Sequence, residues 1–104
     1  TLIVGSGFTT HNLRWFNPAA GPNGVAPTAS SEFDHWAAEA LANKDIEAIL
    51  DFERTAPAAH EAHPRTEHWA PLYVALGAAA GTNHDNESVI DGFWYGLSKR
   101  SWQF

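Results

Sequence analysis

The 104-residue sequence contains no cysteine and no methionine. Without cysteine, the chain forms no disulfide, offers no thiolate to a metal and has no cysteine nucleophile. Long apolar runs are also missing: none approaches the roughly 18 residues that a membrane-spanning helix requires, so we expect no association with a membrane. Histidines and carboxylates therefore remain as the side chains with which this chain could bind a metal or transfer protons.

Positive charge is scarce as well. Six Lys and Arg stand against twelve Asp and Glu, which gives a net charge of −6, and nine of the acids lie between Glu32 and Glu67. Such a surface repels a phosphate backbone, so nucleic acid is a poor partner. The composition, 44% hydrophobic and 17% charged, is typical of a globular protein. We expect one small domain at most, and a cytoplasmic location.

The start of the chain is unusual for an intact reading frame. An apolar, β-type run begins at residue 1 with nothing ahead of it, and methionine is absent throughout. We interpret the chain as the C-terminal piece of a longer protein. A start trimmed by only a few residues is the alternative, and composition alone does not separate the two.

The first half of the chain shows one clear helical pattern. The apolar run at residues 1–5 predicts a short buried strand, and the proline and glycine content of residues 15–29 predicts a loop. Ser30 or Ser31 is then expected to cap a helix. The apolar face of this helix follows the i, i+3, i+4, i+7, i+8 spacing and comprises Phe33, Trp36, Ala37, Ala40 and Leu41.

The second half predicts two more helices and two strands. A short helix should begin at Asp45 and end before Pro57. A third helix is expected over residues 71–80, burying Leu72, Tyr73 and Leu76. Aromatic and β-branched residues predict strands over 89–95 and 98–104.

Six histidines in 104 residues are the strongest chemical signal. His11 is expected on a loop just past the first strand, and His63 and His68 lie in the turn before the third helix. Side chains at strand ends and helix starts can converge on one crevice, so these three are the candidate functional residues. The other three are expected to be solvated flank or loop residues: His35, His60 and His84.

At these residues the chain resembles a known family. The segments that carry the resemblance are Gly5-Ser6-Gly7, Thr10-His11-Asn12-Leu13-Arg14, Phe33-Asp34-His35-Trp36, Ala62-His63-Pro64, and Thr66-Glu67-His68-Trp69-Ala70-Pro71-Leu72-Tyr73. Together with the closing region around Leu97-Ser98, they look like the C-terminal part of a class III extradiol ring-cleavage dioxygenase of the LigB family. The nearest branch is the DOPA 4,5-dioxygenase-like group.

The resemblance implies a fold and a chemistry. Residues 1–104 would form the C-terminal portion of a single α/β catalytic domain, with a mixed sheet flanked by helices. His68 would bind a metal, Fe(II) by preference or Zn(II), with Glu67 as the rival ligand. His11 would either exchange a proton with a catechol-type, DOPA-like substrate or act as a further ligand. His63 would line the substrate pocket, and O₂ would be the second substrate.

The chain departs from the family pattern in two ways. The remaining metal ligands of such enzymes are histidines from the N-terminal half, which is absent here, so the site should be incomplete without that portion as a partner. Arg65 also replaces the small residue or proline often found between the two histidine motifs. Two other classes stay open, a metal-binding or regulatory member without ring cleavage and a structural or interaction domain. The resemblance leaves a homo-oligomer open too.

Overall fold

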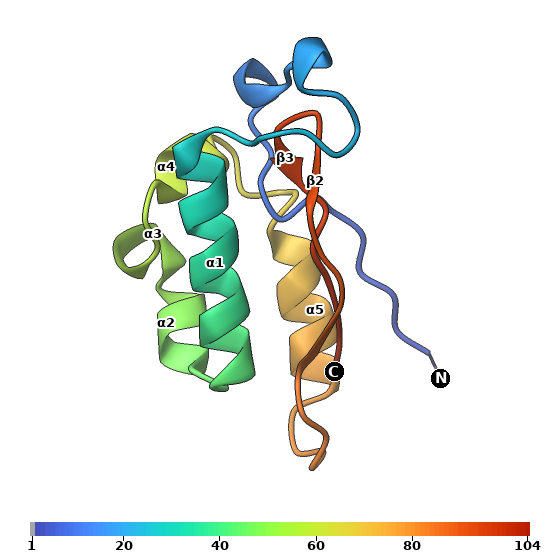
Figure 1. The fold of residues 1–104 in the computed structure, drawn as a ribbon. Coiled ribbons are helices and arrows are strands. Elements are labelled where there is room, and N and C mark those ends of the chain that lie inside the picture. The colour runs from blue at the N-terminus through green and yellow to red at the C-terminus, as the bar shows by residue number, and fades with distance from the viewer. Residues whose placement is uncertain (1) are drawn as a thin grey trace.

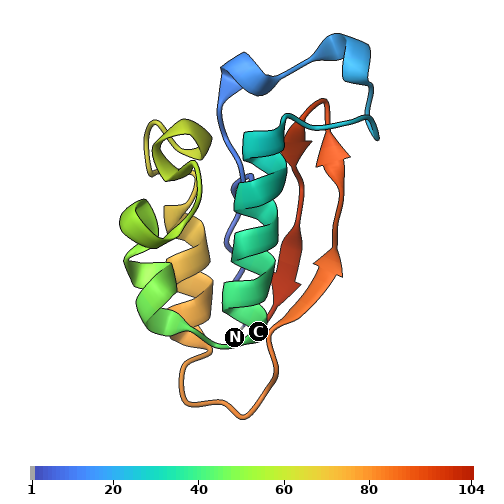
Figure 2. The ribbon, with the colours of Figure 1, turned by 60° about the vertical axis from the view of Figure 1, so that its left-hand side comes forward.

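A computed structural model describes residues 2–104. Helix α1 (Thr28–Ala42) lies at the centre and contacts α2 (Ile46–Leu50) and α4 (Ala59–Ala62) on one side and strand β3 (Leu97–Ser98) on another. Helix α5 (Ala70–Ala78) lies beside α1, as Figures 1 and 2 show from two directions. Helices packed beside antiparallel strands confirm the predicted α/β class. Among the described residues, no helix combines the length and apolar character needed to cross a membrane.

The predicted apolar face of α1 is confirmed. Phe33, Ala37 and Leu41 are fully buried, and Ala40 nearly so. The predicted serine cap is wrong: the helix begins at Thr28, directly after Pro27, and no side chain caps it. Ser30 lies inside the first turns and is buried, and its hydroxyl is hydrogen-bonded to the Thr10 hydroxyl.

The segment after α1 follows the prediction in outline. Asp45 caps α2 through a hydrogen bond from the Ala48 amide, and the helical stretch ends before Pro57 as predicted. It is divided at Asp51 into α2 and α3 (Phe52–Thr55). Helix α4 was not predicted, because four residues are too few to show a helical period.

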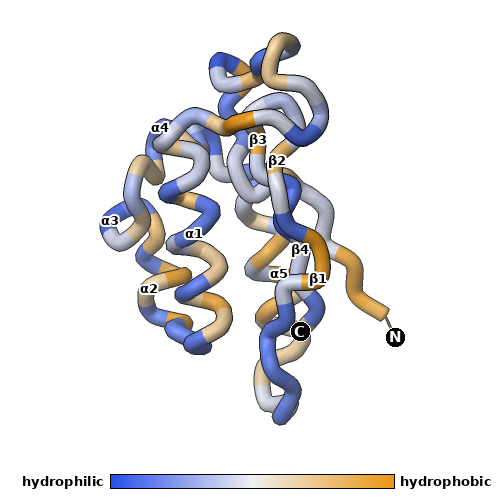
Figure 3. Tube along the Cα trace, viewed as in Figure 1, coloured by the Kyte–Doolittle hydropathy of each residue, from blue (hydrophilic) through white to orange (hydrophobic). Residues whose placement is uncertain are grey.

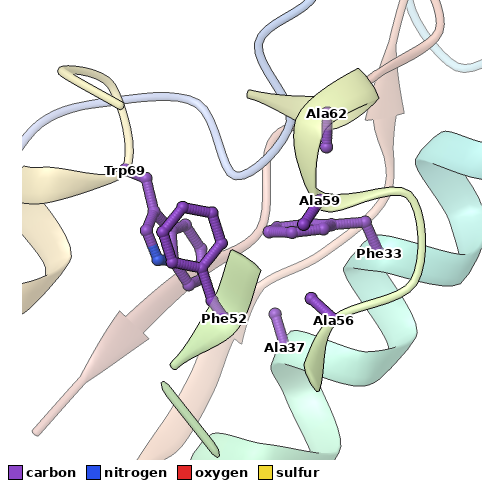
Figure 4. Packing of buried hydrophobic residues seen from close by; sticks show 7 residues of the cluster. All are labelled: Phe33, Ala37, Phe52, Ala56, Ala59, Ala62 and Trp69. Atoms are coloured by element: carbon purple, nitrogen blue, oxygen red, sulfur yellow. The ribbon is translucent and has the colours of Figure 1, made fainter. Parts of the chain in front are cut away.

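The third predicted helix is confirmed as α5, two residues shorter at its C-terminal end than expected. Its residues Leu72, Tyr73 and Leu76 are partly rather than fully buried and pack against the core. That core is made of large aromatic side chains whose rings contact one another, with alanines packed around them, as Figure 4 shows. We call it the aromatic core: Phe33, Ala37, Phe52, Ala56, Ala59, Ala62 and Trp69.

The C-terminal strands form one interrupted antiparallel ribbon. Strand β1 (Glu87–Ile90) pairs with β4 (Ser101–Gln103), and β2 (Phe93–Trp94) pairs with β3. The predicted continuous strand over 89–95 is therefore wrong: it breaks at Gly92, whose φ of 93° is incompatible with a strand. Tyr95 and Gly96, both with positive φ, make the tight turn between β2 and β3.

The N-terminal segment is the largest departure from the sequence prediction. The predicted buried strand falls partly on residue 1, which lies outside the described residues, and residues 2–5 form no strand. Leu2 is 86% exposed and Val4 78%, and Figure 3 shows this end as a hydrophobic stretch on the surface. A strand requires a hydrogen-bonded neighbour, and none of the described residues supplies one.

The predicted loop over residues 15–29 is shorter than expected. One 3₁₀ turn, Leu13–Trp15, ends where the predicted loop begins, and a second, Pro18–Ala20, lies inside it. The last two residues of the predicted loop belong to α1. Asn12 and Asn17 cap these turns through their side chains. The first turn follows His11 directly and so fixes the course of the chain after it.

Candidate functional site

The segment that leads to His11 lies against the start of α5. A Cβ atom added to Gly7 would collide with the backbone carbonyl of His68, and one added to Gly5 would collide with that of Pro71. Only glycine permits so close a backbone approach. The Gly5-Ser6-Gly7 motif therefore holds the His11 loop and the His68 turn together.

His11 and His68 meet face to face. Their ring centroids are 3.6 Å apart and their planes differ by only 14°. His11 lies on the loop before the first 3₁₀ turn, and His68 lies in the turn just before α5, as predicted. Both imidazoles are half-buried, so they remain accessible from one side. The structure thus brings together two of the three histidines that the sequence singled out.

The stacked arrangement favours a neutral imidazole at His11. Partial burial is the main cause that lowers the pKa of His11 below its usual value, and the neighbouring His68 lowers it further. Two facing imidazolium rings would repel each other, so this geometry disfavours the doubly protonated pair. A neutral imidazole can accept a proton or bind a metal.

His63 lies below this pair, inside the protein. Its side chain is nearly inaccessible, and its Nε2 atom donates a hydrogen bond of 2.6 Å to the Thr9 carbonyl. The ring is surrounded by Phe33, Phe52 and Trp69 of the aromatic core. Burial lowers the pKa of His63 to about 4, so the ring is neutral at pH 7.

The two nitrogens of His63 differ in their surroundings. Because Nε2 donates to a carbonyl, it carries the hydrogen, and Nδ1 has a free lone pair. Nδ1 is buried and has no hydrogen-bond partner among the described residues. A buried polar atom without a partner costs stability, which makes it notable in a folded protein.

The turn that carries His68 is anchored from α5. The Trp69 indole nitrogen donates to the Tyr73 hydroxyl at 2.9 Å, and that hydroxyl donates to the Ile49 carbonyl at 2.7 Å. Trp69 itself is 1% exposed. The residue next to His68 is therefore fixed both by packing and by hydrogen bonds.

Glu67, the predicted rival ligand, is oriented toward Arg65. The Arg65 Nε and Glu67 Oε1 atoms are 3.3 Å apart, and both side chains are largely exposed. Its charge slightly raises the pKa of His11, opposing the larger effects of burial and His68. Within residues 2–104, no three His, Cys, Asp or Glu side chains gather closely enough to hold a metal.

The remaining histidines are exposed, as predicted. The His35 side chain is 77% exposed and lies 3.5 Å from Glu39 on the same helix. His60 and His84 are also exposed. None of the three lies in the cluster formed by His11, His63 and His68.

A groove of about 640 Å³ opens beside His68. One wall is the exposed N-terminal segment, and the others are α5 and the ribbon around Trp102. Its lining is mainly aliphatic near Leu2 and Val4, and becomes more polar toward Thr9 and His68. His68, one member of the stacked pair, thus lies on the wall of a largely apolar groove.

The amino-acid sequence matches a known family. The family described as "Catalytic LigB subunit of aromatic ring-opening dioxygenase" matches residues 1–97. The chain belongs to the LigB family. This confirms the resemblance drawn from the histidine motifs, both of which lie within the matched region.

Three relatives of this LigB chain share the name "4,5-DOPA dioxygenase extradiol". The protein of Beta vulgaris is 42% identical over 105 residues, which cover 99% of this chain and 37% of the relative. That of Mirabilis jalapa is 46% identical over 75% of this chain and 28% of its own. That of Portulaca grandiflora is 39% identical, covering 74% and 28%. The chain thus spans between 28% and 37% of the length of these relatives.

Sequence reasoning missed the residues that hold the LigB histidine loop in place. Thr9 and Thr10 are buried, as are Ser30 and Ser98, and Asp34 is 5% exposed. Asp34 and Ser98 lie in stretches that resemble the family, but the sequence analysis assigned neither residue a role. Their burial was the missing information, because short polar residues usually lie on the surface.

Proposed function

We propose that this chain forms part of the active site of an extradiol dioxygenase that uses O₂ to cleave a catechol-type, DOPA-like ring beside the diol. The observation that carries the proposal is the close stacking of His11 on His68, within the two motifs of a LigB chain. The relatives' shared name supports the substrate class.

Within this proposal, His68 is the metal ligand and His11 is not. The lone pair of an imidazole nitrogen lies in the ring plane, and a bound metal lies near that plane at roughly 2.1 Å. Two planes that face each other at 3.6 Å and differ by 14° converge only far beyond that distance. A single ion therefore cannot lie in both planes in this arrangement.

The donor set suits the metals that the family uses. A half-buried imidazole at His68 is a good ligand for Fe(II), which we favour, or for Zn(II). Such a metal, when bound, would supply positions at which the diol oxygens and O₂ bind side by side. Glu67 remains the alternative ligand, and it would first have to leave Arg65.

His11 is then free to transfer a proton. Its lowered pKa keeps it largely neutral at pH 7, so it can accept the proton of a catechol hydroxyl and later return it to the cleaved product. A loop residue beside the ligand-bearing turn can approach the substrate from the side opposite α5.

For His63 we retain the predicted substrate contact as a testable role. Nδ1 is the nitrogen that could make it, since Nε2 is engaged by Thr9. Because the ring is almost fully buried, this contact would require the surrounding wall to open. In the position described here, His63 holds the backbone just before His11.

We further propose that the remaining part of the domain completes the site. It would supply the other metal ligands and cover the apolar surface at Leu2 and Val4, which the described residues leave exposed. The chain's coverage of its relatives, 37% or less, is consistent with that arrangement. A cytoplasmic location and a homo-oligomeric state stay predictions.

The test compares two histidines in the complete domain. His68→Ala should lose most bound iron or zinc, because one of a few ligands is removed. His11→Gln should keep the metal but lose on the order of 10²- to 10⁴-fold in catechol turnover. His35→Gln, at an exposed position outside the cluster, is the matched control and should leave both unchanged.

Metal analysis and oxygen-dependent product formation on the same preparations separate the outcomes. Parallel loss of metal and turnover in His11→Gln would make His11 a ligand and refute the acid–base role. A wild-type domain that binds metal without cleaving catechols would support the regulatory class instead. A domain that binds no metal would leave a structural or interaction role.

A further inference from the structure

The residues immediately before His11 are held by a buried hydrogen-bond network. The Thr10 hydroxyl oxygen accepts a hydrogen bond of 2.8 Å from the Ser98 amide and lies 2.9 Å from the Ser30 hydroxyl. The Thr9 hydroxyl donates to the Arg100 carbonyl at 3.0 Å. These bonds join the His11 loop to α1 and to the β3–β4 ribbon, up to 91 residues away in sequence.

Asp34, on α1, also connects this helix to the β3–β4 ribbon. Its carboxylate accepts a hydrogen bond from the Ser98 hydroxyl and two from the Arg100 guanidinium, both at 2.9 Å. The side chains of Asp34 and Arg100 are only 7% and 17% exposed. A two-point pair of this kind fixes direction as well as distance.

His11 is fixed on its other side by α4. Its backbone amide donates to the Ala62 carbonyl at 2.8 Å, and the Asn12 side chain donates to the Glu61 carbonyl. The chain on either side of His11 is thus attached to three different elements: α1, α4 and the ribbon. Removing one attachment should let the His11 ring turn away from His68.

We infer that Thr10 and Ser98, held by the Asp34–Arg100 pair, are positioning residues that aim the His11 imidazole. Thr10, Ser98 and Asp34 are not among the residues that line the groove, and Arg100, which does line it, holds Asp34. They therefore act on His11 through the backbone that precedes it. The inference rests on the proposed function for its kinetic consequence. Its geometric consequence, the stacking of His11 on His68, can be measured independently.

The sharpest variant is Thr10→Val in the complete domain. Valine has nearly the same shape but removes the acceptor for the Ser98 amide, which is then buried without a partner. Thr10→Ser restores the hydroxyl and is the conservative rescue. Thr55→Val is the control for the same chemical change at an exposed position, because among residues 2–104 the Thr55 hydroxyl bonds to the Ala48 and Asp51 carbonyls, outside the histidine cluster.

We expect Thr10→Val to lower kcat by on the order of 10²-fold with KM near the wild-type value, because a small misplacement of a reacting group has that effect. Metal content should be retained. With ¹⁵N-labelled histidine, the His11 ring signals should shift and the proton contacts between the His11 and His68 rings should weaken. Thr10→Ser and Thr55→Val should behave as wild type in both measurements.

Three results would overturn the inference. They are wild-type kcat and ring contacts in Thr10→Val, an equal loss in Thr10→Ser, or an equal loss in Thr55→Val. If Thr10→Val does not fold, Ser98→Ala cuts the bond to Asp34 while keeping the amide, and it should weaken the same ring contacts. If the wild-type domain cleaves no catechol, the proposed function fails, and the ring contacts alone decide the positioning role.

Discussion

The aromatic core and the N-terminal segment are both rich in apolar residues, yet the side chains of the first are buried and those of the second are exposed. In the core, Phe33 is 0% exposed and Trp69 1%, and their rings lie 5.2 Å apart. In the segment we call the apolar edge, Leu2, Ile3 and Val4 are between 46% and 86% exposed.

The difference shows which part of the site this chain builds by itself. The core surrounds the His63 ring and contains Trp69, the residue after His68, so it fixes both histidines from within the chain. The apolar edge borders the groove beside His68, where the described residues provide no cover. An exposed apolar stretch of this kind marks a surface that normally meets another one.

The largest effect should come from removing the centre of the core. Trp69→Ala should lower the free energy of unfolding by about 3 to 5 kcal/mol, because it leaves a cavity among Phe33, Phe52 and His63. Denaturant unfolding of the chain measures this. Val4→Ala at the edge should change the same quantity by less than about 0.5 kcal/mol. Equal losses of unfolding free energy in the two variants would contradict the difference in burial between the core and the apolar edge.

The next effect concerns pH and tests how fully the core encloses His63. The folded-state pKa of about 4 lies below the usual value of 6.5, so the folded protein binds fewer protons than the unfolded chain between those values. The contribution of His63 to the free energy of unfolding is therefore at its maximum above pH 6.5 and falls by about 3 kcal/mol as the pH drops toward 4. His11, whose pKa is also lowered, adds in the same direction.

Urea unfolding between pH 7 and 4.5 checks this slope. His63→Leu should flatten it, because the buried titratable group is gone. His35→Leu, at a side chain that is 77% exposed, should keep the wild-type slope. A slope that survives His63→Leu unchanged would mean that the ring is not enclosed as described.

The smallest of these losses of stability should come from a substitution in the apolar edge when the rest of the domain covers it. In the complete domain, Val4→Ser should cost about 2 kcal/mol of unfolding free energy, because a buried valine side chain would be lost. In this chain alone the same change should be nearly neutral and should reduce self-association, measured by light scattering. A neutral effect in both settings would show that nothing covers the edge.

Some of the fold could be read from the sequence because it depends on local spacing. The apolar face of α1 repeats at helical intervals, and Asp45 stands where a cap is needed. The short α4 and the break at Gly92 carried too little pattern to predict. The strand expected at residues 1–5 failed for another reason: a strand is defined by its neighbour, which a local pattern does not contain.

The sequence was sufficient to predict which residue types form the site, but it did not predict how their side chains are arranged. His11 and His68 stood out by their motifs, and His35 was correctly expected to be exposed. The burial of His63 and the network around Thr10 could not be foreseen, because they depend on contacts such as Ser98 with Thr10, 88 residues apart.

The sequence by itself determined the LigB membership, the helical periods and the histidines worth testing, since these follow from residue identity and spacing. Only the tertiary structure decided that His11 and His68 stack, that His63 faces inward, and that Leu2 and Val4 remain uncovered. The physical reason is that ring orientation and burial depend on the close packing of distant segments. Here that packing is set by Gly7 against His68, and by Asp34 with Arg100.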